Sequence, residues 1–310
     1  MLNEWFQMKN KGYVYRDRVC AADEGRGVLD FYSRRYPHSH REEWRARIAA
    51  GEVRLNGGPA GSEARLKAGD RLAWHRHPWE EPDAPGEFAA LTEEDSFLVV
   101  DKPAGLPVLP GAGFMENTLL HRVRERFGPG CNPLHRLGRW TSGAVLFART
   151  RDAARSLGRA MQARRFSKTY LALASGTDLP DRLHITIPIG PVVYPPLGTL
   201  HAACENGMPA ESLVEVLHRQ PDRNITLVRV RITTGRPHQI RIHLAAAGYP
   251  LMGDPLYGVE GRPRPGGALP GDPGYRLHAW KLGFPHPRTG KMVDVESPVP
   301  EWALPLSDCF

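Results

Sequence analysis

The sequence has no long apolar stretch, because no run approaches the roughly 20 apolar residues that a membrane-spanning helix needs. The first residues, MLNEWFQMKNKG, also lack the apolar core of a secretory signal. Cysteine is scarce, with four residues far apart in the chain and no pair in a CxxC arrangement. This spacing argues against a zinc site and against a disulfide framework. We therefore expect a cytoplasmic protein with free thiols, no membrane contact and no structural metal.

Lysine is also rare, since it supplies only seven of the 41 basic side chains. Arginine carries most of the positive charge, and the formal net charge of the 310 residues is +7. Guanidinium groups bind phosphate oxygens in pairs, so nucleic acid is an expected partner. An arginine-rich genome would produce the same composition, and the charge alone does not separate these interpretations. The 41% of hydrophobic and 24% of charged residues exclude disordered and fibrous classes and are typical of a chain with about two domains.

Proline, glycine and acidic residues indicate where the chain divides. A run rich in proline and acidic residues predicts a linker at residues 79–90. It separates a small domain at 1–78 from a larger one at 91–310. Within the larger domain, residues 190–209 are predicted to be a long irregular connection, and residues 261–274 an exposed loop.

A small helical unit followed by a hairpin is predicted in the first domain. Apolar residues at helical spacing predict a helix that begins near Val28. Ser39 and Glu42 have the S-x-x-E form of a capping box and predict the start of a second helix. Residues 52–55 alternate as a strand does, and the Asn-Gly pair that follows is typical of a tight hairpin turn.

The runs SHREEWRARIAAGEVRLNG and LKAGDRLAW belong to this unit. Together they resemble the S-four-type RNA-binding domain of ribosomal proteins, over about residues 26–76. The resemblance implies a basic surface that binds folded RNA while the apolar face stays buried. The alternative is that the arginines form only a solvated face. The side chains expected at the RNA are Arg34, Arg35, Arg41 and Arg45.

Several segments of the larger domain predict regular structure. A four-residue spacing of Ala153, Leu157 and Met161 indicates an amphipathic helix. Strands are predicted at residues 97–100, 144–148, 168–174 and 227–232. A polar loop leads directly into the second of these strands, and such loops often position active groups.

Five motifs follow one another from about Phe97 to Pro300: VVDKPAGLPV, LHRLGRWTSGAVLFART, FSKTYLAL, TTGRPHQIRIHLAAAGYPLMGDPLYG and LHAWKLGFPHPRTG. In this order and spacing they resemble the RluA family of RNA pseudouridine synthases. The resemblance implies an α+β fold, in which a mixed, largely antiparallel sheet with flanking helices follows the small helix-hairpin domain. It also implies isomerisation of uridine to pseudouridine in ribosomal or transfer RNA, by a monomer and without a cofactor.

The resemblance assigns roles to single residues. Tyr170, in SKTY, matches the family's active-site tyrosine, which would stack on the flipped uracil. Arg241, in HQIR, matches the buried arginine that pairs with the catalytic aspartate, and Arg236 is a weaker candidate for that role. Plain core packing and a structural ion pair are the alternatives for the first two. The residues expected near the RNA are His135, Arg136, Arg139, Arg236 and His238.

The sequence departs from the family at the nucleophile. The family's HRLD motif carries the attacking aspartate, and Gly138 stands in that place. Asp101 is a weak surrogate candidate, and Asp254 in GDPLYG is another. A buried Arg241 without a carboxylate would cost several kcal/mol, so another group should pair with it. Three functions remain open: a synthase with a displaced nucleophile, a non-catalytic RNA-folding or ribosome-assembly factor, and, with least support, a glycosidase with paired carboxylates.

Overall fold

The computed structural model describes residues 9–37 and 39–304. The chain divides into two compact units, the first at residues 1–81 and the second at residues 82–310. No described helix is long and apolar enough to cross a membrane. Between β4 (Arg71–Arg76) of the first unit and β5 (Ala89–Glu93) of the second, the chain forms neither helix nor strand.

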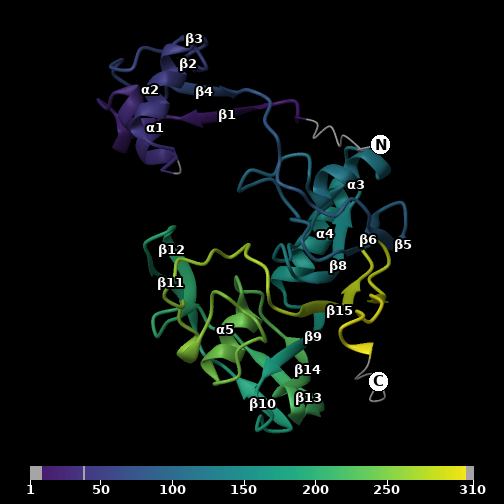
Figure 1. Cartoon of the computed structure of the whole chain (residues 1–310). Helices are drawn as coiled ribbons and strands as arrows, with labels where there is room; N and C mark the ends of the chain where they lie inside the picture. Colours follow the sequence, from purple (N-terminus) through teal and green to yellow (C-terminus); the bar gives the residue numbers. More distant parts are fainter. Residues whose placement is uncertain (1–8, 38, 305–310) are drawn as a thin grey trace, which may run out of the picture. The chain divides into compact units, whose positions relative to one another are not determined.

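The first unit packs two helices against a four-stranded antiparallel sheet in the order β1-β4-β2-β3 (Figure 1). Trp44 on the second helix and Trp74 on β4 are buried, and their rings meet edge to face at 4.7 Å. These aromatic contacts anchor the helices to the sheet. The elements are β1 (Tyr13–Arg18), η1 (Ala21–Asp23), α1 (Val28–Arg35), α2 (Arg41–Ala49), β2 (Val53–Leu55), β3 (Gly58–Pro59) and β4 (Arg71–Arg76).

The two helices and the hairpin of the first unit are confirmed, but the capping box is wrong by one residue. The backbone N–H of His40 donates a hydrogen bond to the Glu43 carboxylate at 2.8 Å. The Ser39 hydroxyl instead accepts a hydrogen bond from Arg47 at 2.9 Å. Two adjacent glutamates made the register ambiguous in the sequence, since either places a carboxylate in the first turn. The prediction also missed β1, which pairs with β4 along its whole length.

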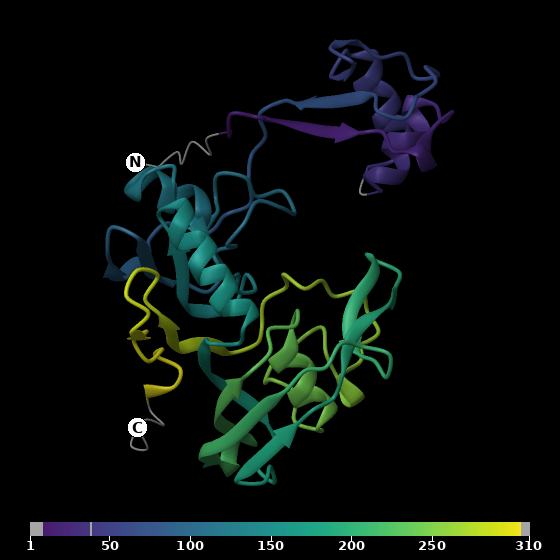
Figure 2. The same ribbon diagram turned by 180° about the vertical axis from the view of Figure 1, so that it is seen from behind.

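A ten-stranded sheet forms the centre of the second unit (Figures 1 and 2). Eight strands follow the order β10-β13-β14-β9-β15-β8-β6-β5, while β16 pairs with β15 and β7 with β8. Only β15 and β8 run parallel among the described pairs, so the expected mixed, largely antiparallel sheet is confirmed. The strands are β5 (Ala89–Glu93), β6 (Phe97–Lys102), β7 (Asn132–Pro133), β8 (Ser142–Ala148), β9 (Ser167–Ser175), β10 (Arg182–Ile185), β13 (Ser212–Gln220), β14 (Ile225–Ile232), β15 (Leu277–Pro285) and β16 (Met292–Glu296).

Helices cover both faces of this sheet. Successive side chains of a strand point to opposite sides, so neighbouring residues of β6 pack against different helices. On β6, Leu98 and Val100 belong to the same buried cluster as side chains of α3 and α5. Phe97 and Val99 belong to a second cluster, which includes α4. The helices are α3 (Leu119–Phe127), α4 (Arg151–Gln162) and α5 (Gln239–Ala246), with short 3-10 turns η2 (Pro221–Arg223) and η3 (Val259–Gly261).

Residues 190–209 contain a hairpin where an irregular connection was predicted. β11 (Ile189–Tyr194) and β12 (Gly198–Ala203) pair along six positions in a separate two-stranded sheet. Pro191 lies within β11, and proline usually argues against a strand because it lacks the N–H of the ladder. A two-stranded ribbon has only edge strands, so the proline is tolerated there. The predicted exposed loop at 261–274 is wrong at its first residue, because Gly261 is buried and ends the 3-10 turn η3 (Val259–Gly261), whereas residues 262–274 contain no helix or ladder strand, as predicted.

Candidate active site

A small cavity lies where the Arg136–Thr141 loop meets β9, the start of α5 and the chain before β15. Its volume is about 100 Å³. Gly138, Tyr170 and Arg241 all line it, so the structure brings together the three residues that the resemblance placed at the catalytic centre. We call it the central cavity.

Two larger grooves adjoin the central cavity and share Arg136 and Arg236 with it. The strand-side groove, of about 540 Å³, passes Lys168 on β9. The hairpin-side groove, of about 590 Å³, passes His201 on β12. Among the described residues, no Asp or Glu lines the cavity or either groove. A concave surface with cations and no carboxylates is suited to binding the phosphate groups of a nucleic-acid backbone.

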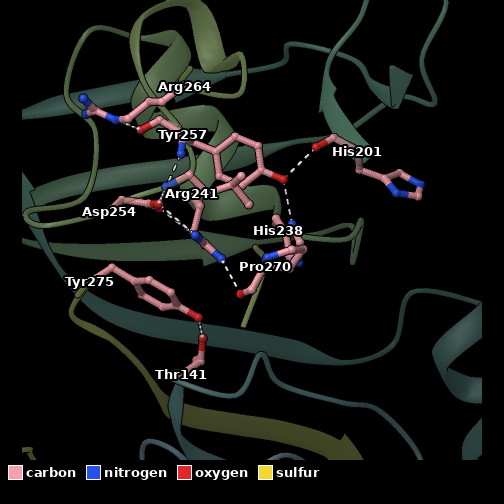
Figure 3. A network of polar contacts seen from close by, with 10 residues as sticks. Thr141, His201, His238, Arg241, Asp254, Tyr257, Arg264, Pro270 and Tyr275 are labelled. Atoms are coloured by element: carbon pink, nitrogen blue, oxygen red, sulfur yellow. Dashed lines mark hydrogen bonds and ion pairs between the residues drawn. The ribbon is translucent and has the colours of Figure 1, made fainter. Parts of the chain in front are cut away.

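Arg241, on α5, forms a buried two-point ion pair with Asp254 (Figure 3). Its Nε lies 2.7 Å from Oδ2 and its Nη2 lies 2.7 Å from Oδ1, with 3% and 1% of the two side chains exposed. Nη1 donates to the carbonyl of Pro270 at 3.2 Å. Burial is the largest single effect and lowers the pKa of Arg241, but the hydrogen bonds with Asp254 and the charge interactions with Asp254, Tyr275 and Tyr257 together outweigh it and raise the pKa. The guanidinium therefore has its counter-charge without any side chain at position 138.

Neither surrogate carboxylate lines the central cavity. The Oδ1 of Asp254 also accepts hydrogen bonds from two backbone N–H groups of the following turn, at 2.9 and 3.2 Å. Asp254 is thus the expected replacement partner of Arg241, with both oxygens occupied. Asp101, on β6, accepts a hydrogen bond from Ser297 at 2.8 Å, and burial raises its pKa. Asp101 lies outside all three concave sites, and we assign it no catalytic role.

Within residues 9–37 and 39–304, no three His, Cys, Asp or Glu side chains lie close enough together to hold a metal ion.

Tyr170 lies between the central cavity and the strand-side groove, because its side chain lines both. It pairs in register with Val230 of β14, and 8% of the residue is exposed. Burial raises the pKa of its hydroxyl to about 12, which keeps the phenol neutral at physiological pH. A neutral aromatic ring held by a strand at a cavity wall can stack on a base.

Tyr275 fills the space beside Gly138. A Cβ at position 138 would lie 3.0 Å from the Tyr275 Oη and 3.4 Å from the Thr141 Oγ1. The two hydroxyls are 3.4 Å apart, and the Arg241 Cζ stands 4.1 Å from the centre of the Tyr275 ring (Figure 3). Tyr275 was not predicted at the site, and its only signal in the sequence was its place two residues ahead of the LHAW motif.

Two histidines expected near the RNA are uncharged. The Nε2 of His135 accepts a hydrogen bond from the backbone N–H of Leu146 at 3.1 Å. The Nδ1 of His238 lies 2.6 Å from the Tyr257 Oη, and its φ of 55° turns the chain into α5. Burial lowers the pKa of each imidazole to about 3. Both line the concave sites as neutral groups and therefore cannot bind phosphate as cations.

Arg139 and Lys102 hold the loop at residues 103–106. The Nε of Arg139 donates to the Gly105 carbonyl at 2.9 Å, although its side chain also lines the hairpin-side groove. Lys102 is fully buried and donates to the carbonyls of Pro103, Leu106 and Arg139 at 2.8, 2.8 and 3.0 Å. This lysine, which was not predicted at the site, connects the strand β6 to the loop that carries Gly138.

The four arginines predicted at the RNA surface of the first unit are exposed on α1 and α2. Three of them have acidic neighbours: the pairs are Arg35–Asp17, Arg41–Asp30 and Arg45–Glu42. The pairs of Arg41 and Arg45 are exposed at both side chains, and exposed ion pairs of this kind contribute little to stability. The guanidinium groups can therefore exchange these partners for phosphate at low cost.

Comparisons with known proteins converge on one family. Residues 96–246 match a family model described as RNA pseudouridylate synthase. A Synechocystis sp. protein described as an uncharacterized RNA pseudouridine synthase is 41% identical over 275 residues, which cover 88% of this chain and 94% of that protein. The ribosomal large subunit pseudouridine synthase D of Nitrosomonas europaea is 38% identical over 217 residues, covering 68% and 62% of the two chains. The solved structure of human RNA pseudouridylate synthase domain containing 1 matches with a TM-score of 0.58 and 29% identity, over 74% of this chain and 90% of that one.

Proposed function

This chain belongs to the RluA family of RNA pseudouridine synthases, and we propose that it isomerises uridine to pseudouridine in ribosomal or transfer RNA. The observation that carries the proposal is the meeting of Tyr170 and Arg241 at one cavity, with an acid-free basic groove on each side. The relative from Nitrosomonas europaea is named for the ribosomal large subunit. This name favours ribosomal RNA as the first substrate to examine.

The reaction needs the uridine outside its stack. Tyr170 would hold the flipped uracil by stacking, which is worth about 1–3 kcal/mol per base. Arg136 and Arg236, which line all three concave sites, would bind the phosphates on either side of it. In this arrangement the flanking strand follows the two grooves while the sugar of the target faces Gly138.

The first unit would supply a second RNA contact. Its arginines lie on two adjacent short helices above a small sheet, as in the S-four-type domain that the sequence resembles. We assign Arg34, Arg35, Arg41 and Arg45 to phosphate binding that adds affinity without reading bases. Such contacts give a binding constant that falls steeply with salt.

A deletion and complementation experiment tests the proposed activity. Pseudouridine is mapped at each position of ribosomal and transfer RNA from cells with and without this gene. The deletion is complemented with the natural chain, with Tyr170→Leu, or with the matched control Tyr249→Leu. Tyr249 lies outside the three concave sites, and its hydroxyl donates to the Asp178 carbonyl. We expect one or more positions to be lost on deletion and restored by the natural chain and the control, but not by Tyr170→Leu. An unchanged map would refute the proposal.

Gly138 favours one competing function, in which the protein binds RNA but no longer isomerises uridine. Glycine has no group that can attack a sugar, and no carboxylate among the described residues lines the central cavity. The purified natural chain separates the two functions. A binding protein would bind the RNA without converting any uridine, whereas a synthase converts it in a single turnover.

A further inference from the structure

The central cavity offers few groups that can replace a carboxylate at the sugar. The hydroxyls on its wall belong to Thr141, Tyr170 and Tyr275. Tyr170 is assigned to stacking on the base, which leaves two hydroxyls near position 138. Phenols ionise near pH 10, far below an aliphatic alcohol, so a tyrosine oxygen is the better nucleophile of the two at neutral pH.

The Tyr275 oxygen occupies the place that the missing side chain would use. A carboxylate oxygen of an aspartate lies about 2.4 Å from its own Cβ by ordinary bond geometry. The Tyr275 Oη lies 3.0 Å from the Cβ position at residue 138. The phenol oxygen thus lies in nearly the same shell around position 138 as a carboxylate oxygen there.

The surroundings of Tyr275 hold this oxygen in place and put a cation beside its ring. Only 2% of the residue is exposed, and its hydroxyl meets the Thr141 hydroxyl at 3.4 Å. The guanidinium of Arg241 lies over its ring at 4.1 Å. A cation over the ring stabilises a developing phenolate more than the neutral phenol.

We propose that the Tyr275 hydroxyl acts at the ribose in place of the family's aspartate. The inference rests on the proposed function, since it names the nucleophile of that same reaction. Tyrosine serves as the nucleophile at a sugar carbon in some glycosidases, so the chemistry has a physical precedent.

The step balances without any added reactant. The Tyr275 oxygen bonds to ribose C1′, the C1′–N1 bond breaks with its electron pair on the uracil, and the phenolic proton passes to N1. After the base turns, C5 bonds to C1′ and the oxygen–C1′ bond breaks with its electron pair on the phenolate. The proton on C5 then returns to the phenolate, which gives pseudouridine and the original tyrosine.

Single-turnover kinetics of Tyr275→Phe in the full chain test the inference. The substrate is an RNA fragment that contains the position found by deletion mapping. We expect the conversion rate to fall at least about 100-fold, the usual scale for losing a catalytic group, while RNA affinity and thermal unfolding stay near those of the natural chain. The matched control is Tyr249→Phe, which removes a phenol outside the central cavity and should leave the rate unchanged.

Two further variants keep the test decisive. Gly138→Asp added to Tyr275→Phe places a carboxylate where the phenol oxygen was, and we expect it to restore part of the rate. Replacing Tyr275 by 3,5-difluorotyrosine keeps the ring and makes the phenol more acidic, so the pH–rate profile should move to lower pH. A purely structural tyrosine would give neither the rescue nor the shift.

The possible failures differ from one another. If the natural chain converts uridine and Tyr275→Phe converts it equally fast, the inference is overturned and the proposed function stands. If the natural chain binds the RNA but converts none, both are overturned. Loss of activity together with loss of RNA binding would also count against a catalytic role, because it assigns Tyr275 to the architecture of the pocket.

Discussion

Replacing Asp254 by asparagine should destabilise the second unit strongly, because it removes the counter-charge of a buried guanidinium. Both side chains of the Arg241–Asp254 pair are nearly inaccessible, and the two hydrogen bonds between them are 2.7 Å long. Asparagine fills the same volume but carries no charge. Breaking a buried ion pair from one side costs about 3–5 kcal/mol, since the remaining charge is left without a partner.

Hydrogen exchange of the α5 amides, read by mass spectrometry, measures this loss in the second unit alone. At about 1.4 kcal/mol per tenfold change, the expected loss speeds exchange by about two to four orders of magnitude. The control is Asp152→Asn, whose partner Arg155 is 65% exposed while Asp152 is 91% exposed. This surface change should alter exchange by about threefold or less. An acceleration below tenfold for Asp254→Asn would refute the reasoning, whereas adding Arg241→Met to it should recover much of the protection.

Three further predictions follow from other contacts. Lys102→Met leaves three carbonyls without their donor, and we expect a loss of about 3 kcal/mol or more in thermal or urea unfolding; a loss under about 1 kcal/mol would contradict it. His135 and His238 have folded-state pKa values of about 3, below those of the unfolded chain, so stability falls as the pH drops from about 6.5 towards 3, by up to about 1.4 kcal/mol per pH unit for each. Urea unfolding at several pH values in that range measures the free energy of unfolding, which should fall less steeply with decreasing pH in His135→Gln than in the natural chain. An unchanged pH dependence would refute the assignment. Charge reversal in Arg41→Glu with Arg45→Glu should weaken RNA binding at least about tenfold and flatten its salt dependence without lowering the melting temperature.

The sequence predicted the elements that follow a simple period. The predicted strands of the larger domain match β6, β8, β9 and β14, because each alternates or runs apolar on a buried sheet. Proline misled the prediction at β11, where a two-stranded ribbon tolerates it. The register of the capping box failed because two adjacent glutamates satisfied the same pattern.

The composition of the site was only partly predictable. Motif order placed Gly138, Tyr170 and Arg241 together, and the structure brings all three to one cavity. Asp254, the partner of Arg241, lies in a turn 13 residues later in the chain. Tyr275, which lies beside Gly138, is 134 residues from its hydroxyl neighbour Thr141. No periodicity marks residues 262–274, and only the folded chain shows that this loop's Pro270 carbonyl accepts a hydrogen bond from Arg241.

The charges at the site explain how the chain tolerates glycine at position 138. In a site where one carboxylate is both the nucleophile and the only partner of a buried arginine, its loss would leave an unpaired charge and cost several kcal/mol. Here Asp254 neutralises the charge of Arg241 and accepts two of its hydrogen bonds. A carboxylate at residue 138 is therefore not needed to balance that charge, and its absence does not destabilise the fold. Tyr275 then fills the vacated volume with a ring that lies against the same guanidinium. The stability of the pocket and the identity of its reacting group are therefore separate properties, and for this reason Tyr275→Phe should change the chemistry far more than the folding free energy.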